Sequence, residues 1–301
     1  MAEGRSDDFK KHFCGTHFFN PPRYLRLLEI IPTPHTDQSV VDFLMHYGDL
    51  VLGKTTVLCK DTPAFIANRI GMFSIMSIFH IMDKLGLNID EVDALTGPII
   101  GRPKSATFRT ADVVGIDTLV KVAKGVADNC KTDEAIDIFN IPSWLNKVVE
   151  NNWLGDKTKQ GFFKKMPQSP EGTKEILTLD LKTMEYGKRV KPKFTSLETA
   201  KPIEDLKTRI KALQAGTDKA GEFYRAFHYS LFSYISYRIP EISDEIYRVD
   251  DAMMAGFGWE IGAFETWDVL GVAKTVEAMK ANGIKVAAWV DEMLANGFAS
   301  F

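Results

Sequence analysis

The sequence predicts a mainly α fold in which a short α/β segment, the tail of a larger sheet domain, precedes two copies of an all-helical domain. Apolar stretches of strand length occur only before residue 60, and long apolar stretches with helical spacing follow them. An eight-residue motif also occurs twice. We therefore expect a sheet-domain remnant over residues 1–60, a first helical domain over 61–166, a linker over 167–219 and a second helical domain over 220–301.

The first sixty residues read as strand, turn, strand, helix and strand. Apolar strands are predicted over residues 13–19 and 25–31, and the Pro21–Pro22 pair between them enforces a turn or an extended link. Thr36 or Asp37 can cap a helix that runs to about Tyr47, and residues 55–59 form a third strand. This order is typical of the last part of an α/β sheet.

Helices are expected from residue 61 onward. Thr62 and Pro63 are the residue types of an N-cap and a first helical turn. The stretch 65–85 is apolar nearly all round and predicts a buried helix, and a second helix begins near Ile89. Residues 167–215 are richer in Lys, Thr and Pro, which indicates a linker with some local structure.

An internal repeat predicts the duplication. Phe108–Gly115 and Phe264–Gly271 share five of eight residues at an offset of 156, and Asp93 and Asp250 match at an offset of 157. Each match follows a long apolar helical stretch. Two copies of one helical unit indicate a duplicated domain.

Composition excludes several classes of protein. The chain has 37 Lys and Arg, 40 Asp and Glu and a net charge of −3, so no basic excess favours nucleic acid or an anionic membrane. Three unpaired cysteines favour a reducing compartment. The longest nearly uncharged run, 70–82, is too short to span a bilayer. The N-terminus lacks the apolar core of a signal peptide. We expect a cytoplasmic protein.

His17 is the first candidate for chemistry. It lies at the end of a predicted strand, before Asn20 and the two prolines, where its imidazole would be held rigidly. An imidazole titrates near neutral pH and is suited to act as a general base. The alternative is a histidine that only fills the end of the strand.

Glu29 and Asn68 are polar residues in apolar surroundings. If the first two strands are neighbours, Glu29 could reach the imidazole of His17 and fix its tautomer, as carboxylates do in hydrolytic triads. Otherwise it faces solvent at a strand edge. Asn68, beside Arg69, could hydrogen-bond a substrate oxygen, or it could be a structural amide satisfied by a loop.

The other motifs in the sequence do not indicate a functional site. The remaining histidines have no ligand partners at metal-binding spacing, so no metal site is predicted. Residues 256–262 resemble a dinucleotide loop only superficially, because they follow a helical stretch and lack the third glycine. We interpret them as a turn between helices.

Three motifs together resemble the 3-hydroxyacyl-CoA dehydrogenase family of fatty-acid β-oxidation. They are Gly15–Pro21 with Leu27–Ile31, Cys59–Arg69, and Gly155–Phe163. The match covers about residues 13–165, and residues 220–301 resemble the duplicated helical domain of the long multifunctional members. The resemblance implies that residues 1–60 are the C-terminal tail of a Rossmann domain and that the two helical domains are the family's C-terminal domain in duplicate.

The resemblance also implies roles. His17 falls on the catalytic histidine, Glu29 on the carboxylate paired with it, and Asn68 on the asparagine that positions the substrate. Asn20 and Lys157 fall on positions that contact NAD. The implied reaction interconverts 3-hydroxyacyl-CoA and 3-ketoacyl-CoA with NAD as the cofactor.

Two departures from the family lead to further expectations. The family's Gly-rich phosphate loop and its catalytic serine would lie upstream of residue 1, so we interpret the chain as a truncated fragment that is inactive alone. Ala64 stands where the family usually has glycine.

Two hypotheses about function follow. The first is an NAD-dependent dehydrogenase that acts on an acyl-CoA. The second is a non-catalytic helical module for assembly or acyl-CoA contact, with homodimer or inter-domain contacts through its helical faces.

Overall fold

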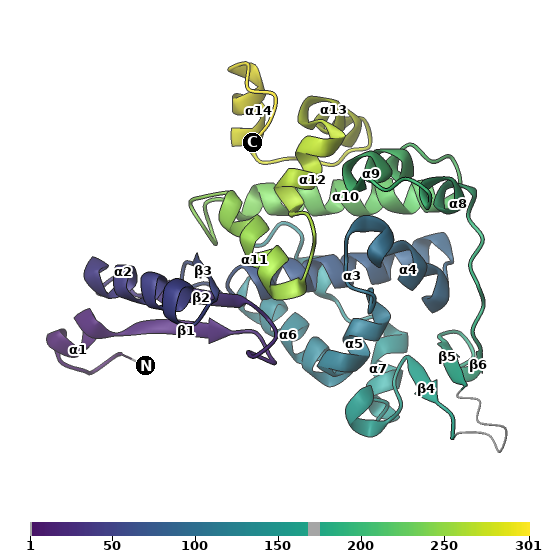
Figure 1. The fold of residues 1–301 in the computed structure, drawn as a ribbon, viewed down its shortest axis with the longest axis horizontal. Coiled ribbons are helices and arrows are strands. Elements are labelled where there is room, and N and C mark those ends of the chain that lie inside the picture. Colours follow the sequence, from purple (N-terminus) through teal and green to yellow (C-terminus); the bar gives the residue numbers. More distant parts are fainter. Residues whose placement is uncertain (1, 168–174) are drawn as a thin grey trace. The chain divides into compact units, whose positions relative to one another are not determined.

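The computed structural model describes residues 2–167 and 175–301 (Figure 1). Met1 and residues 168–174 lie outside the described residues. Residues 168–174 belong to the predicted linker. The contacts divide the chain into two compact units. Unit 1 combines Met1–Gly71 with Phe232–Phe301, and unit 2 is Met72–Leu231. The domain boundaries predicted from the sequence remain predictions.

Unit 1 contains a three-stranded mixed sheet and helices from both ends of the chain. The strands lie in the order β1-β2-β3, with β1 antiparallel and β3 parallel to the central strand. The strands are β1 (Cys14–Phe18), β2 (Leu27–Pro32) and β3 (Thr55–Leu58). The helices that lie wholly in this unit are α1 (Asp7–His12), α2 (Gln38–His46), the π-helical Tyr47–Val51, α11 (Tyr247–Phe257), α12 (Ala263–Leu270), α13 (Val272–Ala281) and α14 (Ala288–Ala295). The predicted strands and the predicted helix near residues 37–47 are confirmed.

The central strand β2 is buried on both faces. Leu28 and Ile30 pack with Val41 of α2 on one face. Leu27, on the other face, lies close to Gly256 of α11, where an added Cβ would come within 2.8 Å of the leucine. The continuous apolar run of β2 is therefore explained by helices on both sides. Glu29 shares the face of Leu27, because side chains alternate along a strand.

The long apolar stretch forms α3 (Ala67–Leu85), which crosses from unit 1 into unit 2. The prediction that Thr62 caps this helix is wrong. The helix begins at Ala67, after turns at residues 63–66 in which Ala64 and Phe65 have positive φ values of 65° and 52°. Its first amides are capped instead by Glu29, which lies 37 residues before Ile66 in the sequence.

Unit 2 surrounds an aromatic core. Phe108 and Trp144 lie with ring centroids 5.0 Å and 5.1 Å from Phe79, and Phe162 lies 4.7 Å from Phe108. These residues come from a helix each and from the chain just before β4. The elements wholly in this unit are α4 (Ile89–Leu95), α5 (Phe108–Val114), α6 (Ile116–Asn129), α7 (Ser143–Glu150), β4 (Phe163–Lys165), β5 (Ile176–Asp180), β6 (Glu185–Lys188), α8 (Thr195–Ala200) and α9 (Leu206–Gln214), with short 3₁₀ turns at Pro98–Ile100, Ile136–Phe139 and Asp156–Thr158. The helix α10 (Lys219–Arg238) crosses back into unit 1.

The predicted fold class is wrong in its description of the part after residue 61 as all-helical. The strands β4, β5 and β6 form a second, antiparallel sheet. The segment expected as a linker contains β5, β6, α8 and α9. The strand β6 is short and largely exposed, and β5 is a five-residue strand with one buried residue, so neither shows the apolar alternation that marks a half-buried strand in a sequence.

No helix within residues 2–167 and 175–301 is both long and apolar enough to cross a membrane.

Candidate active site

The structure brings His17 and Glu29 together. The two residues are direct partners in the antiparallel pairing of β1 and β2. His17 Nδ1 lies 2.7 Å from Glu29 Oε2. The register of the sheet places both side chains on the same face, because opposite residues in an antiparallel pair point the same way. The sequence left open whether Glu29 pairs with His17 or faces solvent, and the structure shows a part-buried hydrogen bond between the two.

Glu29 is a fully buried carboxylate, and its other oxygen is also satisfied. Oε1 accepts hydrogen bonds from the backbone amides of Ile66 and Ala67, at 3.1 Å and 2.9 Å. The side chain has an exposed fraction of 0%. Amides at the N-terminus of a helix have no partner inside the helix and favour a negative charge. The start of α3 therefore holds the carboxylate in the orientation that receives His17.

His17 is only partly covered. Its side chain is 32% exposed, and its ring lies between those of Phe19 and Phe65, with centroids 5.4 Å and 5.5 Å away. The ring of Phe19 contacts Phe257 of α11 in turn. The aromatic contacts restrict the imidazole, while the exposure leaves it accessible to a small molecule.

The charge of Glu29 also acts on a thiol that the sequence analysis did not single out. Cys59 follows β3, is buried, and donates from Sγ to the carbonyl oxygen of Val57 over 3.6 Å. Burial raises the pKa of the Cys59 thiol, and the charge of Glu29 raises that pKa further. The group is therefore a neutral donor rather than a nucleophile. Its place after an apolar strand gave no signal in the sequence, because the neighbouring carboxylate comes from another strand.

The remaining predicted residues lie in different places. Asn68 is half-buried in the first turn of α3, and Asn20 is exposed beyond the end of β1. Arg69, next to Asn68, is fully buried in unit 1, where its Nε donates to the hydroxyl of Tyr234 over 2.6 Å. Lys157 belongs to unit 2, where its ammonium group pairs with Asp117.

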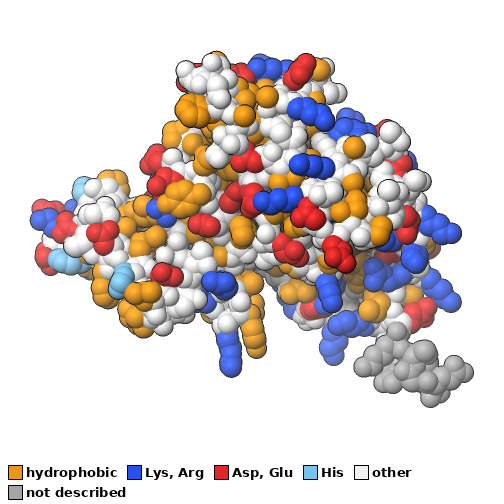
Figure 2. Space-filling view, turned by 45° about the horizontal axis from the view of Figure 1, so that its top comes forward, with side chains coloured by type: hydrophobic (Ala, Val, Ile, Leu, Met, Phe, Trp, Pro, Cys, Tyr) orange, Lys and Arg blue, Asp and Glu red, His pale blue; other side chains and the backbone are white. Residues whose placement is uncertain are grey.

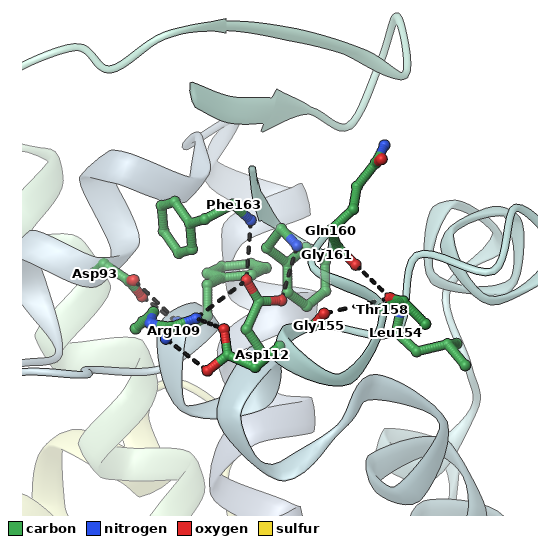
Figure 3. A network of polar contacts seen from close by, with 12 residues as sticks. Asp93, Arg109, Asp112, Leu154, Gly155, Thr158, Gln160, Gly161 and Phe163 are labelled. Atoms are coloured by element: carbon green, nitrogen blue, oxygen red, sulfur yellow. Dashed lines mark hydrogen bonds and ion pairs between the residues drawn. The ribbon is translucent and has the colours of Figure 1, made fainter. Parts of the chain in front are cut away.

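A second polar cluster lies in unit 2 (Figure 3). Asp112 of α5 accepts hydrogen bonds from the amides of Phe162 and Phe163, at 2.8 Å and 3.0 Å, and so ties the segment before β4 to the helix. Burial raises the pKa of Asp112 to about 6. Arg109 makes a two-pronged contact with Asp156, at 2.8 Å and 2.7 Å. Sequence analysis missed this cluster because its members come from segments far apart in the chain.

Comparison with protein families identifies two domains in the chain. The family model described as the NAD-binding domain of 3-hydroxyacyl-CoA dehydrogenase matches residues 3–62. The model described as the C-terminal domain of the same enzyme matches residues 65–165. The His17–Glu29 pair lies in the first match, and Asn68 and Lys157 lie in the second.

Curated relatives and solved structures agree with these matches. A probable 3-hydroxyacyl-CoA dehydrogenase of Bacillus subtilis is 48% identical over 301 residues, which are 100% of this chain and 37% of the relative. One from Deinococcus radiodurans is 47% identical over 165 residues, 55% of this chain and 47% of the relative. The chain thus spans less than half the length of these relatives. The fold resembles that of a 3-hydroxybutyryl-CoA dehydrogenase from Escherichia coli, with a TM-score of 0.63 at 17% identity over 95% of this chain and 71% of that one.

These matches correct the interpretation of the N-terminal region. The sequence predicted that residues 1–60 are only the tail of a Rossmann domain and that the chain is truncated. The match of the NAD-binding model to residues 3–62 overturns that description, because it assigns these residues to the NAD-binding domain itself. Residues 1–60 are shorter than a full dinucleotide-binding domain, and this length led to the prediction of a remnant.

Proposed function

The chain belongs to the 3-hydroxyacyl-CoA dehydrogenase family, and we propose that it takes part in the NAD-dependent interconversion of 3-hydroxyacyl-CoA and 3-ketoacyl-CoA. The observation that carries the proposal is the 2.7 Å contact between His17 Nδ1 and the buried Glu29. A partly exposed imidazole held by a buried carboxylate has the geometry of a general base that is fixed in orientation.

In this mechanism His17 moves the proton of the substrate hydroxyl. With its proton on Nδ1, the imidazole donates to Glu29 and leaves the lone pair of Nε2 free to accept a proton. In oxidation Nε2 takes the proton from the 3-hydroxyl group, and in reduction it returns a proton to the ketone oxygen. Glu29 stabilises the imidazolium that forms, because its negative charge is fixed 2.7 Å away.

NAD would supply the hydride acceptor or donor when bound. Asn20, three residues after His17, is exposed and offers a carboxamide to a polar cofactor. Elsewhere in unit 1, the buried hydroxyl of Thr62 has no hydrogen-bond partner among the described residues. We propose that Asn20 and Lys157 contact NAD and that Asn68 positions the substrate oxygen. To contact NAD, the ammonium group of Lys157 would have to leave its ion pair with Asp117.

The experiment is an assay of NADH oxidation with acetoacetyl-CoA on the purified chain, a H17Q variant and a matched H35Q variant. His35 is an exposed histidine outside the pair. We expect H17Q to lower kcat by about 10²-fold or more, the usual contribution of a general base, and H35Q to leave it unchanged. Equal activity of H17Q and the unaltered chain would contradict the role of His17.

A non-catalytic role in assembly is the second candidate. Four large apolar side chains of the α2 region are 40–66% exposed: Phe43, Tyr47, Leu50 and Val51. Such a group is typical of an interaction surface. Failure of the unaltered chain to oxidise NADH, together with self-association that a F43E/L50E variant abolishes in sedimentation, would favour this candidate. That outcome would also agree with the sequence-based expectation that the chain is inactive alone. The homodimer and the cytoplasmic location stay predictions.

A further inference from the structure

Unit 2 contains a cavity of about 840 Å³ whose lining is rich in cations. It lies between α4, the segment around Asp156, the start of the β4–β5 pair and the residues that follow β6. Six cationic side chains line it: Lys104, Arg109, Lys159, Lys165, Arg189 and Lys191. Figure 2 shows Lys and Arg side chains concentrated on the part of the surface that carries the β4–β6 sheet. All the lining residues belong to one unit, so the cavity does not depend on how the units are placed.

The carboxylates in the lining already have partners. Asp156 is held by the two-pronged contact with Arg109. Asp90 accepts hydrogen bonds from Arg189 Nε and from the amide of Val190, both at 2.9 Å. These contacts leave little negative charge to attract the remaining cations, since each carboxylate is engaged by a guanidinium or by backbone amides.

Asp93 is the third carboxylate, and it is engaged by backbone alone. It accepts from the amides of Thr107, Phe108 and Arg109, at 3.1 Å, 2.7 Å and 3.2 Å (Figure 3). Burial raises its pKa to about 7. Its lone pairs are therefore directed at the start of α5 and are not free for a lysine.

The four lysines of the lining are not engaged in ion pairs within the described part of the chain. Lys104, Lys159, Lys165 and Lys191 are exposed, and none of them makes an ion pair with a carboxylate among residues 2–167 and 175–301. Two of them act on carboxylates at longer range: Lys165 helps to lower the pKa of Asp156, and Lys191 helps to lower that of Glu198. Like charges gathered around a concave surface repel one another and create a positive potential inside it. An anion that enters the cavity relieves this repulsion.

We infer that this cavity binds a phosphate-bearing small molecule of nucleotide size, held by the four lysines. The volume lies within the range of small-molecule sites, about 300–1,000 Å³. Phe163, Ile176 and Val190 supply an apolar part of the lining against which a non-phosphate portion can pack. Two sources have this chemistry: the phosphorylated nucleotide end of a coenzyme A thioester, or a free nucleotide. The inference does not depend on the proposed dehydrogenase function.

The test is isothermal titration calorimetry on the full chain with ATP, adenosine 3′,5′-bisphosphate and adenosine. The pocket variant is K159Q/K165Q, which keeps a polar side chain at each position and removes two charges. The matched control is K121Q/K124Q, which removes two charges from exposed positions of α6 outside the cavity. We expect at least one phosphorylated probe to bind and adenosine not to bind. The pocket variant should weaken binding about tenfold or more, and the control less than about twofold.

Each outcome bears on the inference. Binding of the bisphosphate but not of ATP assigns the site to the coenzyme A end, and the reverse assigns it to a free nucleotide. No binding of either phosphorylated probe, or equal weakening by both variants, would overturn the inference. Because the variants change only exposed lysines, circular dichroism spectra matching the unaltered chain are expected and serve as the folding control.

Discussion

Glu29 joins three parts of the chain through one side chain. It contacts His17 of β1 and the amides of Ile66 and Ala67 at the start of α3, and its charge raises the pKa of the Cys59 thiol after β3. The sequence predicted only the first contact, because the spacing of two neighbouring strands is a local pattern. The contact with the two amides depends on how α3 enters the fold, and no spacing in the sequence encodes that.

Ala64 is the residue at which a departure from the family has a structural cost. Its φ value of 65° lies in the left-handed region, which costs a residue with a Cβ roughly 1–2 kcal/mol and costs glycine little. We expect A64G to raise the free energy of unfolding by up to about 1 kcal/mol, since the relief of strain exceeds the added entropy of the unfolded chain. Urea denaturation of the variant measures this change.

The control for this prediction is A127G, in the last turn of α6. There the same substitution should lower the free energy of unfolding by about 1 kcal/mol, because the backbone is helical and glycine has a poor helix propensity. If both variants lost stability equally, the positive φ at Ala64 would not be a source of strain.

At the scale of elements, local patterns predicted several helices and strands well. The strands β1, β2 and β3, the helix α2 and the start of α4 at Ile89 agree with their sequence signals. The start of α3 was misplaced, since its cap is a distant carboxylate. The β4–β6 sheet was missed because its strands are short and two of them lie in the segment rich in Lys, Thr and Pro, so that pairing with one another defines them.

The repeat in the sequence corresponds to a repeated capping contact. Asp93 accepts from the amides of Phe108 and Arg109 at the start of α5, and Asp250 accepts from those of Phe264 and Glu265 at the start of α12. The one-residue difference between the two offsets in the sequence is absorbed in the segment between cap and helix. Each aspartate satisfies amides that the helix leaves unpaired.

The second of these caps predicts a pH dependence. Burial raises the pKa of Asp250 to about 6, well above the usual value of an aspartate. The folded state therefore binds the proton more tightly than the unfolded state, and stability from this group is present below about pH 4 and is lost as the pH rises through about 6. Relative to D250N, which cannot titrate, the unaltered chain should lose up to about 3 kcal/mol over this window.

Urea denaturation at several pH values measures the difference between the two proteins. The matched control is D251N, which changes the neighbouring aspartate of the same helix. Its stability should stay parallel to that of the unaltered chain. A constant difference between D250N and the unaltered chain from pH 4 to pH 7 would refute the predicted linkage.

At the scale of the whole molecule, unit 1 is assembled from two segments that lie far apart in the sequence. Arg69 joins them. It donates to Tyr234, and its guanidinium lies 3.1 Å from Glu241. Domain predictions from the sequence followed the order of the chain, and such a pairing of an early with a late segment leaves no trace in composition or periodicity.

Because this guanidinium is fully buried, its removal should be costly. We expect R69M to lower the free energy of unfolding by about 3 kcal/mol, since the hydroxyl of Tyr234 and the carboxylate of Glu241 both lose a partner. The exposed R26M serves as the control and should change stability by less than about 0.5 kcal/mol. Thermal and urea denaturation both measure the change. An R69M protein as stable as R26M would show that Arg69 does not join the segments.

The shared use of Glu29 has a consequence for how substitutions at this position are tolerated. The same carboxylate that orients His17 also closes the beginning of α3. A replacement at residue 29 would therefore be penalised twice, once in turnover and once in the amount of folded protein. In a saturation library, a screen for abundance alone should already deplete variants at this position, whereas variants at His17 should pass that screen and fail only when turnover is selected.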